Sequence, residues 1–197
     1  MHKMAKQLAL VGVMLMAAVL ACNANLPSNP QPPIPSLQAS TGDADAFEQQ
    51  FKQAISQASS TGKFTATISQ QQLSSWLVLR APDFAKKQGY EWPLNNVQAG
   101  LNDGKITLYG VINEQNLPQT PAQIIFTPSI DGNGELAVKV DSGQVGVVGV
   151  PADILGNLNK AIKDMLTSQL SQIKGRYKLD NLAVANGSLT VSGQVVQ

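Results

Sequence analysis

The sequence predicts an α+β fold in which a curved antiparallel β-meander wraps against one long C-terminal amphipathic helix, with one or two shorter N-terminal helices. Three observations predict this class. Apolar residues recur with helical periodicity from Pro151 to Lys174, strands of alternating polarity follow one another from Val97 onward, and Asn186-Gly187 marks a tight hairpin near the end of the chain. A helix and a sheet that each have one apolar side would bury those sides against each other.

The first 21 residues are interpreted as a lipoprotein signal peptide. Lys3 and Lys6 give a positively charged start, and residues 8–20 form an apolar run of 13 residues. This run is shorter than the roughly 20 residues that a membrane-spanning helix needs. Val19-Leu20-Ala21-Cys22 resembles the lipobox cleaved by lipoprotein signal peptidase, and Cys22 is the only cysteine. By resemblance to bacterial lipoproteins, Cys22 would carry a diacylglyceryl thioether that anchors the protein. The alternative is an ordinary secretory signal with an incidental cysteine.

The mature chain lacks the residue types that most catalytic sites use. Removing residues 1–21 takes away Lys3, Lys6 and the only histidine, His2, so 12 of the 14 basic residues remain against 13 acidic ones, a net charge of −1. Without histidine or a free thiol, the chain has no histidine-dependent triad, no cysteine nucleophile and no zinc site of His/Cys type. Near-neutral charge argues against nucleic acid. We therefore expect no metal, no cofactor and no nucleic acid partner.

Residues 22–46 are predicted to form a tether. Five prolines lie within residues 25–36. A chain of this composition is extended and semi-rigid, and it would reach at most about 75 Å at ~3.1 Å per residue. Such a tether would hold residues 47–197, a single α+β lipid-binding-like domain, away from the bilayer.

The N-terminal part of this domain is expected to hold two helices and a strand. Apolar residues recur at three- and four-residue intervals over Ala46–Ser60, which predicts a helix, and Lys63–Ile68 alternates as a strand does. Residues 69–72 have the spacing of a capping box. They predict a short helix that ends at Ala81-Pro82, because proline does not continue a helix.

Residues 97–144 are interpreted as four strands of an antiparallel meander. The expected ranges are Val97–Asn102, Lys105–Asn113, Ala122–Ile130 and Glu135–Gln144, with turns at Asp103-Gly104 and Asp131–Gly134 and a loop through Pro118 and Pro121. Ile124, Ile125 and Phe126 put apolar groups on both faces of the third strand. We therefore expect this strand to lie centrally in its sheet.

Pro151–Lys174 is predicted to be the long helix. Pro151 suits the first helical position, and Gly175 follows a cationic last turn. The apolar residues on one side are Ile154, Leu155, Leu158, Ile162, Met165, Leu166, Leu170 and Ile173. Burying eight such side chains would stabilise by roughly 12–24 kcal/mol. Ordering some two dozen residues costs at least as much, so the helix must dock on a partner.

The last two strands are expected to supply that partner. Tyr177–Ala185 and Ser188–Val196 flank Asn186-Gly187, a pair typical of a two-residue type I′ hairpin. The final strand has one apolar face and one polar face, which indicates a half-buried sheet with a helix laid on it.

The order of these elements resembles the LmeA-like phospholipid-binding proteins and the YpmS-like proteins of bacterial envelopes, relatives of the tubular lipid-binding (TULIP) superfamily. The segments that carry the resemblance are Thr67–Leu73, Val97–Leu108, Gly149–Leu155 and Leu182–Ser192. These families lack a catalytic signature, so no catalytic residue is transferred to this chain. The resemblance implies a curved antiparallel sheet around a long helix, with an apolar channel between them that accepts acyl chains.

The sequence therefore predicts a membrane-anchored extracytoplasmic lipoprotein that binds, or also transfers, phospholipid or another acyl-chain ligand. Its anchor on Cys22 would lie at the outer face of the cell membrane, or in the inner or outer membrane of a cell with two. The residues expected to line the channel are Trp76, Leu77, Ile125, Ile154, Leu158, Ile162, Met165, Leu166 and Leu170. An ordinary core position is the alternative for each of them.

Two other classes of function stay open. A non-enzymatic envelope scaffold or protein-interaction module would pack solidly and use its surface loops. An enzyme would need paired carboxylates, and the spacing of the candidates places no pair on one face. These candidates are Asp83, Glu91, Glu114, Asp131 and Asp141. We therefore expect that the protein is not an enzyme.

Overall fold

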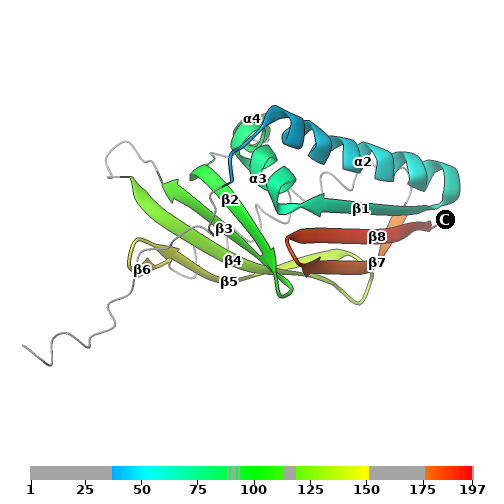
Figure 1. The fold of residues 1–197 in the computed structure, drawn as a ribbon. Coiled ribbons are helices and arrows are strands. Elements are labelled where there is room, and N and C mark those ends of the chain that lie inside the picture. Colours follow the sequence, from blue (N-terminus) through cyan, green and yellow to red (C-terminus); the bar gives the residue numbers. More distant parts are fainter. Residues whose placement is uncertain are drawn as a thin grey trace, which may run out of the picture.

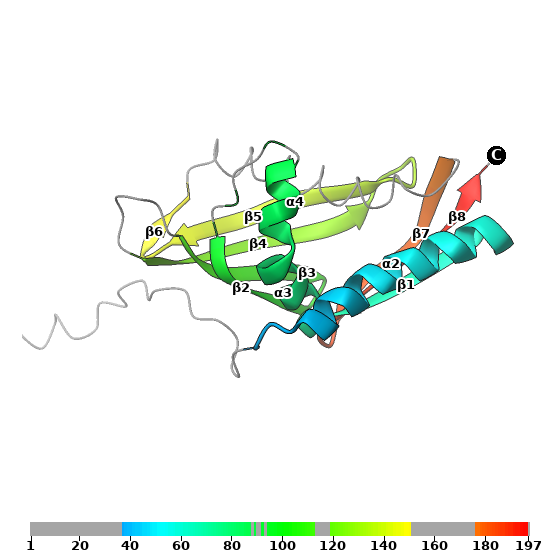
Figure 2. The same ribbon diagram turned by 90° about the horizontal axis from the view of Figure 1, so that it is seen from above.

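The computed structural model describes residues 37–87, 89, 92, 94–112, 119–150 and 176–196. Within these residues the chain forms three helices and two antiparallel sheets, one of three strands and one of five. Figures 1 and 2 show the helices on one side of the strands, with α2 running along β1. The predicted α+β class is confirmed.

Helix α2 spans Thr41–Thr61 and begins earlier than the predicted Ala46–Ser60. Its N-cap is Ser40, whose Oγ accepts a hydrogen bond from the Asp43 N–H at 3.1 Å. It ends at Gly62, whose φ of 72° lies in the left-handed region that glycine adopts easily.

Residues 37–46, assigned by the sequence to the tether, therefore belong to the fold. The Leu37 N–H donates to Gln98 Oε1 at 3.3 Å, and the Ser40 N–H donates to Ser75 Oγ at 3.2 Å. The predicted helix start at Ala46 is too late, because a serine cap and short polar residues start this helix. Apolar periodicity does not detect such a start.

Strand β1 spans Lys63–Ser69 and leads directly into helix α3, Gln70–Leu79. The predicted capping box is confirmed. Ser69 Oγ accepts from the Gln72 N–H at 3.2 Å, and Gln72 Oε1 accepts from the Ser69 N–H at 2.9 Å.

Helix α4 spans Ala81–Lys87, where the sequence predicted only the end of the preceding helix. Pro82 lies in the first turn of α4, where its missing N–H leaves no helical hydrogen bond unmade. Arg80 caps α3, and its carbonyl accepts from the Phe84 N–H at 3.0 Å. The proline therefore separates two helices instead of ending helical structure.

The three-stranded sheet has the order β1-β8-β7, with β7 at Arg176–Ala185 and β8 at Ser188–Val196. The predicted terminal hairpin is confirmed, and Asn186 and Gly187 have φ of 52° and 74°, as a type I′ turn requires. The hairpin pairs with β1 and so forms a sheet separate from the meander. Helix α2 packs on β1.

The five-stranded sheet has the order β2-β3-β4-β5-β6, which confirms the predicted four-stranded meander and adds the short strand β6, which the sequence did not predict. Its strands are β2 (Leu94–Asn102), β3 (Lys105–Ile112), β4 (Thr120–Ile130), β5 (Leu136–Val145) and β6 (Val148–Gly149). Strand β4 lies centrally, as predicted. Pro121, expected in a loop, lies near the start of β4 opposite Val111, and its carbonyl accepts from the Gly146 N–H.

Turns join the two sheets through backbone hydrogen bonds. The Gly104 N–H donates to the Val184 carbonyl, and the Gly187 N–H donates to the Leu101 carbonyl, each at 2.8 Å. The Leu179 N–H donates to the Gly134 carbonyl at the same distance. The tight turns predicted from the sequence thus also fix the sheets against each other.

One face of the five-stranded sheet is apolar and buried. Its buried residues are Val97, Ala99, Leu101, Ile106, Leu108, Ala122, Ile124, Phe126, Leu136 and Val138. They align in rows across the strands, as in the row Leu101, Ile106 and Phe126. Helix α3 packs on β2 at the edge of this sheet.

The long helix predicted over Pro151–Lys174 lies outside the described residues. These stop at Val150, just after β6 of the five-stranded sheet, and resume at Arg176 in β7 of the other sheet. The wrapping of the meander around a C-terminal helix therefore stays a prediction, and the described C-terminus consists of strands.

Candidate functional site

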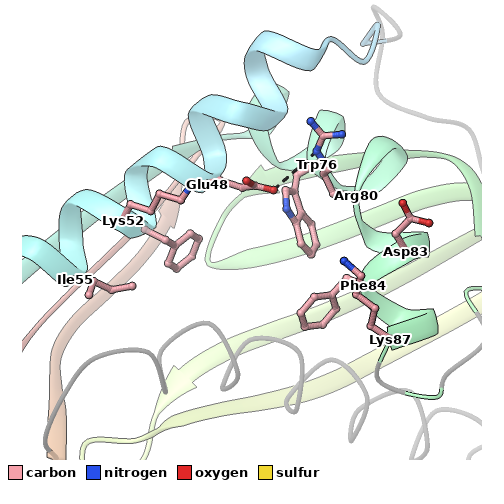
Figure 3. Close-up of a pocket in the computed structure, with 9 residues that line it drawn as sticks. Glu48, Lys52, Ile55, Trp76, Arg80, Asp83, Phe84 and Lys87 are labelled. Carbon is pink, nitrogen blue, oxygen red and sulfur yellow. Dashed lines mark ion pairs between the residues drawn. The ribbon is translucent and has the colours of Figure 1, made fainter.

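A hollow of about 280 Å³ lies between α2, α3 and α4. Its apolar lining comes from all three helices: Phe51 and Ile55 on α2, Trp76 on α3 and Phe84 on α4. Figure 3 shows Trp76 between the side chains of α2 and those of α4, with Ile55 and Phe84 on opposite sides of the hollow. The capping box and the proline-separated helix pair place α3 and α4 so that their aromatic residues converge.

Trp76 is the centre of an aromatic cluster. Its ring stacks on Phe47 with centroids 5.0 Å apart and meets Phe84 at 5.9 Å with the planes tilted by 58°. Phe47 in turn contacts Phe51 at 5.1 Å. Aromatic pairs at such separations favour these offset and tilted geometries. Trp76 is only 5% exposed, so the cluster gives the hollow a rigid apolar wall.

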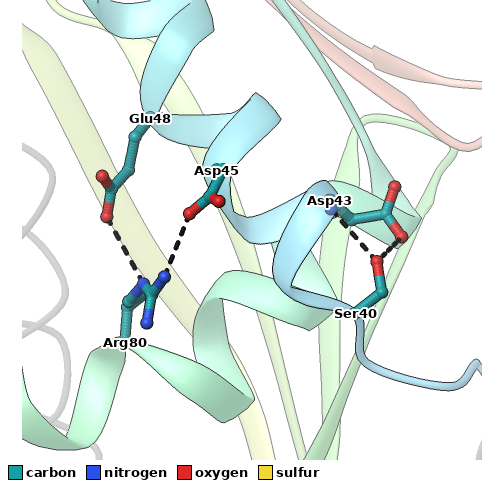
Figure 4. Close-up of polar contacts among 5 residues, drawn as sticks. All are labelled: Ser40, Asp43, Asp45, Glu48 and Arg80. Atoms are coloured by element: carbon teal, nitrogen blue, oxygen red, sulfur yellow. Dashed lines mark hydrogen bonds and ion pairs between the residues drawn. The ribbon is translucent and has the colours of Figure 1, made fainter.

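Charged residues surround the apolar lining. They are Glu48, Lys52, Arg80, Asp83 and Lys87. Arg80 ties α3 to α2, since its guanidinium lies 3.0 Å from Asp45 Oδ1 and 3.9 Å from Glu48 Oε1, as Figure 4 shows. These side chains are 40–55% exposed, and surface pairs of this kind contribute about 0–1 kcal/mol each. The ion pairs of Arg80 therefore link α3 to α2 but add little to the free energy of unfolding.

Of the channel residues predicted from the sequence, the structure places one in the lining of this hollow and two elsewhere in the fold. Trp76 lines the hollow, but Leu77 is a core residue, 2% exposed, and is not part of the lining. Ile125 is half-buried on β4, on the face opposite Ile124 and Phe126, and does not line this hollow. The other predicted site residues lie outside the described residues: Cys22, Ile154, Leu158, Ile162, Met165, Leu166 and Leu170.

Sequence reasoning missed Phe84 and Lys87, because it recognised no helix after Pro82. The signal was present. Pro82 and Asp83 suit a first helical turn, and Lys86-Lys87 suit a last one, since the helix dipole favours acidic residues at its start and basic ones at its end.

A second hollow, of about 290 Å³, lies at the edge of the five-stranded sheet, beside β4, β5 and β6. Its lining is uncharged: Gln123, Ser142, Gly143, Gln144, Val147 and Gly149. Val147 and the neighbouring Val148 are 55% and 66% exposed. This hollow has neither an aromatic nor a charged lining residue, so it offers fewer groups that could recognise a ligand than the hollow between the helices.

Within the described residues, no three histidine, cysteine, aspartate or glutamate side chains come together as metal ligands would. In the same part of the chain, no helix has both the length and the apolar character needed to cross a bilayer. A scan against protein-family models and searches of curated proteins and of solved structures all find no match.

Proposed function

We propose that this protein is an extracytoplasmic lipoprotein, anchored through acylated Cys22, whose folded domain binds the hydrocarbon chain of a phospholipid or another amphiphile. The observation that carries this proposal is the aromatic hollow between α2, α3 and α4. An apolar lining with a few polar groups at its margin is typical of a small-molecule site. The only histidine and the only cysteine lie within residues 1–22, so the proposed mature domain has neither residue type to offer for catalysis.

The hollow is small for a whole lipid. Drug-sized ligands occupy sites of about 300–1,000 Å³, and the hollow measures about 280 Å³. We propose that it holds one end of the ligand and that the helix predicted over Pro151–Lys174 supplies further apolar surface. Trp76, which the sequence predicts to line the channel, lines the hollow. The resemblance to LmeA-like proteins points to the same class of ligand.

The experiment is extraction of the protein from membranes in a neutral maltoside detergent, followed by native mass spectrometry. We expect a population with one bound amphiphile that survives gentle activation. The variant Phe84→Ser should lose that population, because a hydroxyl group would replace part of the apolar wall. Lipid-free protein, unchanged by added phospholipid, would instead support the scaffold alternative.

The anchor is tested separately with Cys22→Ser. Growth with radiolabelled palmitate should label the wild type and leave the variant unlabelled, because the thioether needs the cysteine thiol. Equal labelling of the two proteins would rule out Cys22 as the lipid attachment site. The matched control is Ser28→Ala, a small change in the same proline-rich segment, which should keep the label.

A further inference from the structure

The helical hollow has two lysines on opposite sides, Lys52 on α2 and Lys87 on α4. Figure 3 shows each of them beside the apolar lining contributed by its own helix, Ile55 next to Lys52 and Phe84 next to Lys87. Both lysines are exposed. An exposed lysine that lies alongside apolar surface can direct its charge toward the end of a bound molecule.

Neither lysine forms an ion pair within the described residues. The ion pairs there join Arg80 to Asp45 and Glu48, and Asp141 to Lys105 and Lys139. Arg80 therefore already has its acidic partners, and one of them, Glu48, is itself a lining residue. Asp83 is the one acidic lining residue that forms no ion pair in this part of the chain. The lining as a whole holds three basic residues, Lys52, Arg80 and Lys87, against two acidic ones, Glu48 and Asp83, a net charge of +1.

We propose that this hollow binds a single-chain amphiphile with an anionic head, a carboxylate or a phosphate monoester, held between Lys52 and Lys87. The proposal rests on the proposed function and names the class of ligand for the same site. The chain would lie against Phe51, Trp76 and Phe84, and the head would face the two lysines. A volume of about 280 Å³ suits part of one chain and leaves little room for two.

The test compares three palmitoyl amphiphiles on the full-length lipoprotein in neutral maltoside detergent, by native mass spectrometry. They are palmitate, lysophosphatidate and the neutral monopalmitoylglycerol. We expect at least one anionic ligand to bind about tenfold more tightly than the neutral one, since its head would form ion pairs with two exposed lysines. A preference for palmitate identifies a carboxylate head, and a preference for lysophosphatidate a phosphate head.

Charge-removing variants test the role of the lysines. Lys52→Gln with Lys87→Gln should lose the anionic preference and keep the affinity for monopalmitoylglycerol. Lys86→Gln is the matched control, because it removes a neighbouring exposed lysine of α4 that does not line the hollow. Asp83→Asn should strengthen binding of the anionic ligands, and added salt should weaken it.

The outcomes separate this inference from the proposed function. Equal binding of all three amphiphiles, unchanged in the double lysine variant, would overturn the anionic head and leave chain binding intact. Binding of none of them, by protein whose thermal melt shows it to be folded, would overturn both.

Discussion

Asp141 is the residue whose ionisation the structure most clearly controls. Its Oδ2 accepts from the Thr127 hydroxyl at 2.7 Å, and Lys105 and Lys139 lie 3.5 and 3.7 Å from its carboxylate. The register of β4 against β5 shifts between Ile125 and Phe126, which adds Asp141 to β5 as an extra residue. The Thr127 hydrogen bond, followed by the two lysines, lowers the pKa of Asp141 below 3.8 despite partial desolvation of the carboxyl.

This pKa predicts how stability depends on pH. Because the folded-state pKa of Asp141 lies below its unfolded value, the carboxylate contributes stability above about pH 4, and this is lost as the pH falls through the folded-state pKa. Thr127→Val should lower the free energy of unfolding by about 0.5–1 kcal/mol near neutral pH, because it removes a hydrogen bond to a charged group that solvent partly screens. Urea unfolding at a series of pH values measures this, and the difference from wild type should shrink as the pH falls through the folded-state pKa of Asp141.

Thr107→Val is the control for this prediction. Thr107 is half-buried in β3 of the same sheet and forms no side-chain hydrogen bond within the described residues. Its substitution should change stability by less than about 0.5 kcal/mol at every pH. A Thr127→Val difference that stays constant with pH would contradict the assigned cause of the low pKa.

At the scale of elements, the packing of β7 on β8 depends on Gly193. This buried glycine of β8 pairs with Phe64 of β1 and Leu179 of β7. A Cβ at this position would clash with the Lys178 carbonyl oxygen and come within 2.9 Å of the Phe64 ring. The register of β7 against β8 shifts between Leu179 and Asn181, and the backbone of Lys178 and Leu179 lies close to this glycine.

Gly193→Ala is therefore expected to destabilise the domain by about 1–3 kcal/mol, because neither a strand backbone nor a buried ring moves easily. The matched control is Gly100→Ala in β2. Gly100 is also buried, but an added Cβ would meet only ordinary contacts, at 3.8 Å from Tyr109 and 3.9 Å from Thr107. Thermal melts compare the two variants. Equal melting temperatures would show that β7 can move away from Gly193.

At the scale of the whole molecule, the two sheets and the helical layer form one folded unit. Backbone hydrogen bonds between turns join the sheets, and α3 bridges them by following β1 of one sheet and packing on β2 of the other. The apolar face of the five-stranded sheet and the hollow between the helices belong to this same unit. The predicted helix over Pro151–Lys174 connects the two sheets in sequence.

The proposed function predicts how this helix responds to a charge. Leu158→Asp should keep the domain folded and remove the bound lipid, because the charge would face a ligand channel and not a solid core. Lys160→Asp, which places the same side chain on the polar side of the predicted helix, should retain the lipid. Thermal melts run together with native mass spectrometry give the answer, and unfolding of Leu158→Asp would favour a solid core.

Local signals predicted much of the fold. Alternating strands, the capping box at Ser69 and the Asn186-Gly187 turn were all found, because each depends on residues a few positions apart. Boundaries that depend on caps and proline were not found: α2 begins before Ala46, α4 follows Pro82, and Pro121 lies within β4. Of the residues that line the hollow, the sequence predicted only Trp76 for a ligand channel and named Asp83 only as a candidate carboxylate. Phe51 and Phe84 were missed because they come from two other helices.

The sequence alone determined the α+β class, the order of strands in the meander and the final hairpin, because periodicity and turn chemistry act over short distances. Only the tertiary structure decided that this hairpin pairs with β1 as a separate sheet. It also decided that α2, α3 and α4 bring aromatic residues and two lysines around one hollow. Such arrangements depend on contacts between residues far apart in the chain, and no local pattern records which apolar face will meet which.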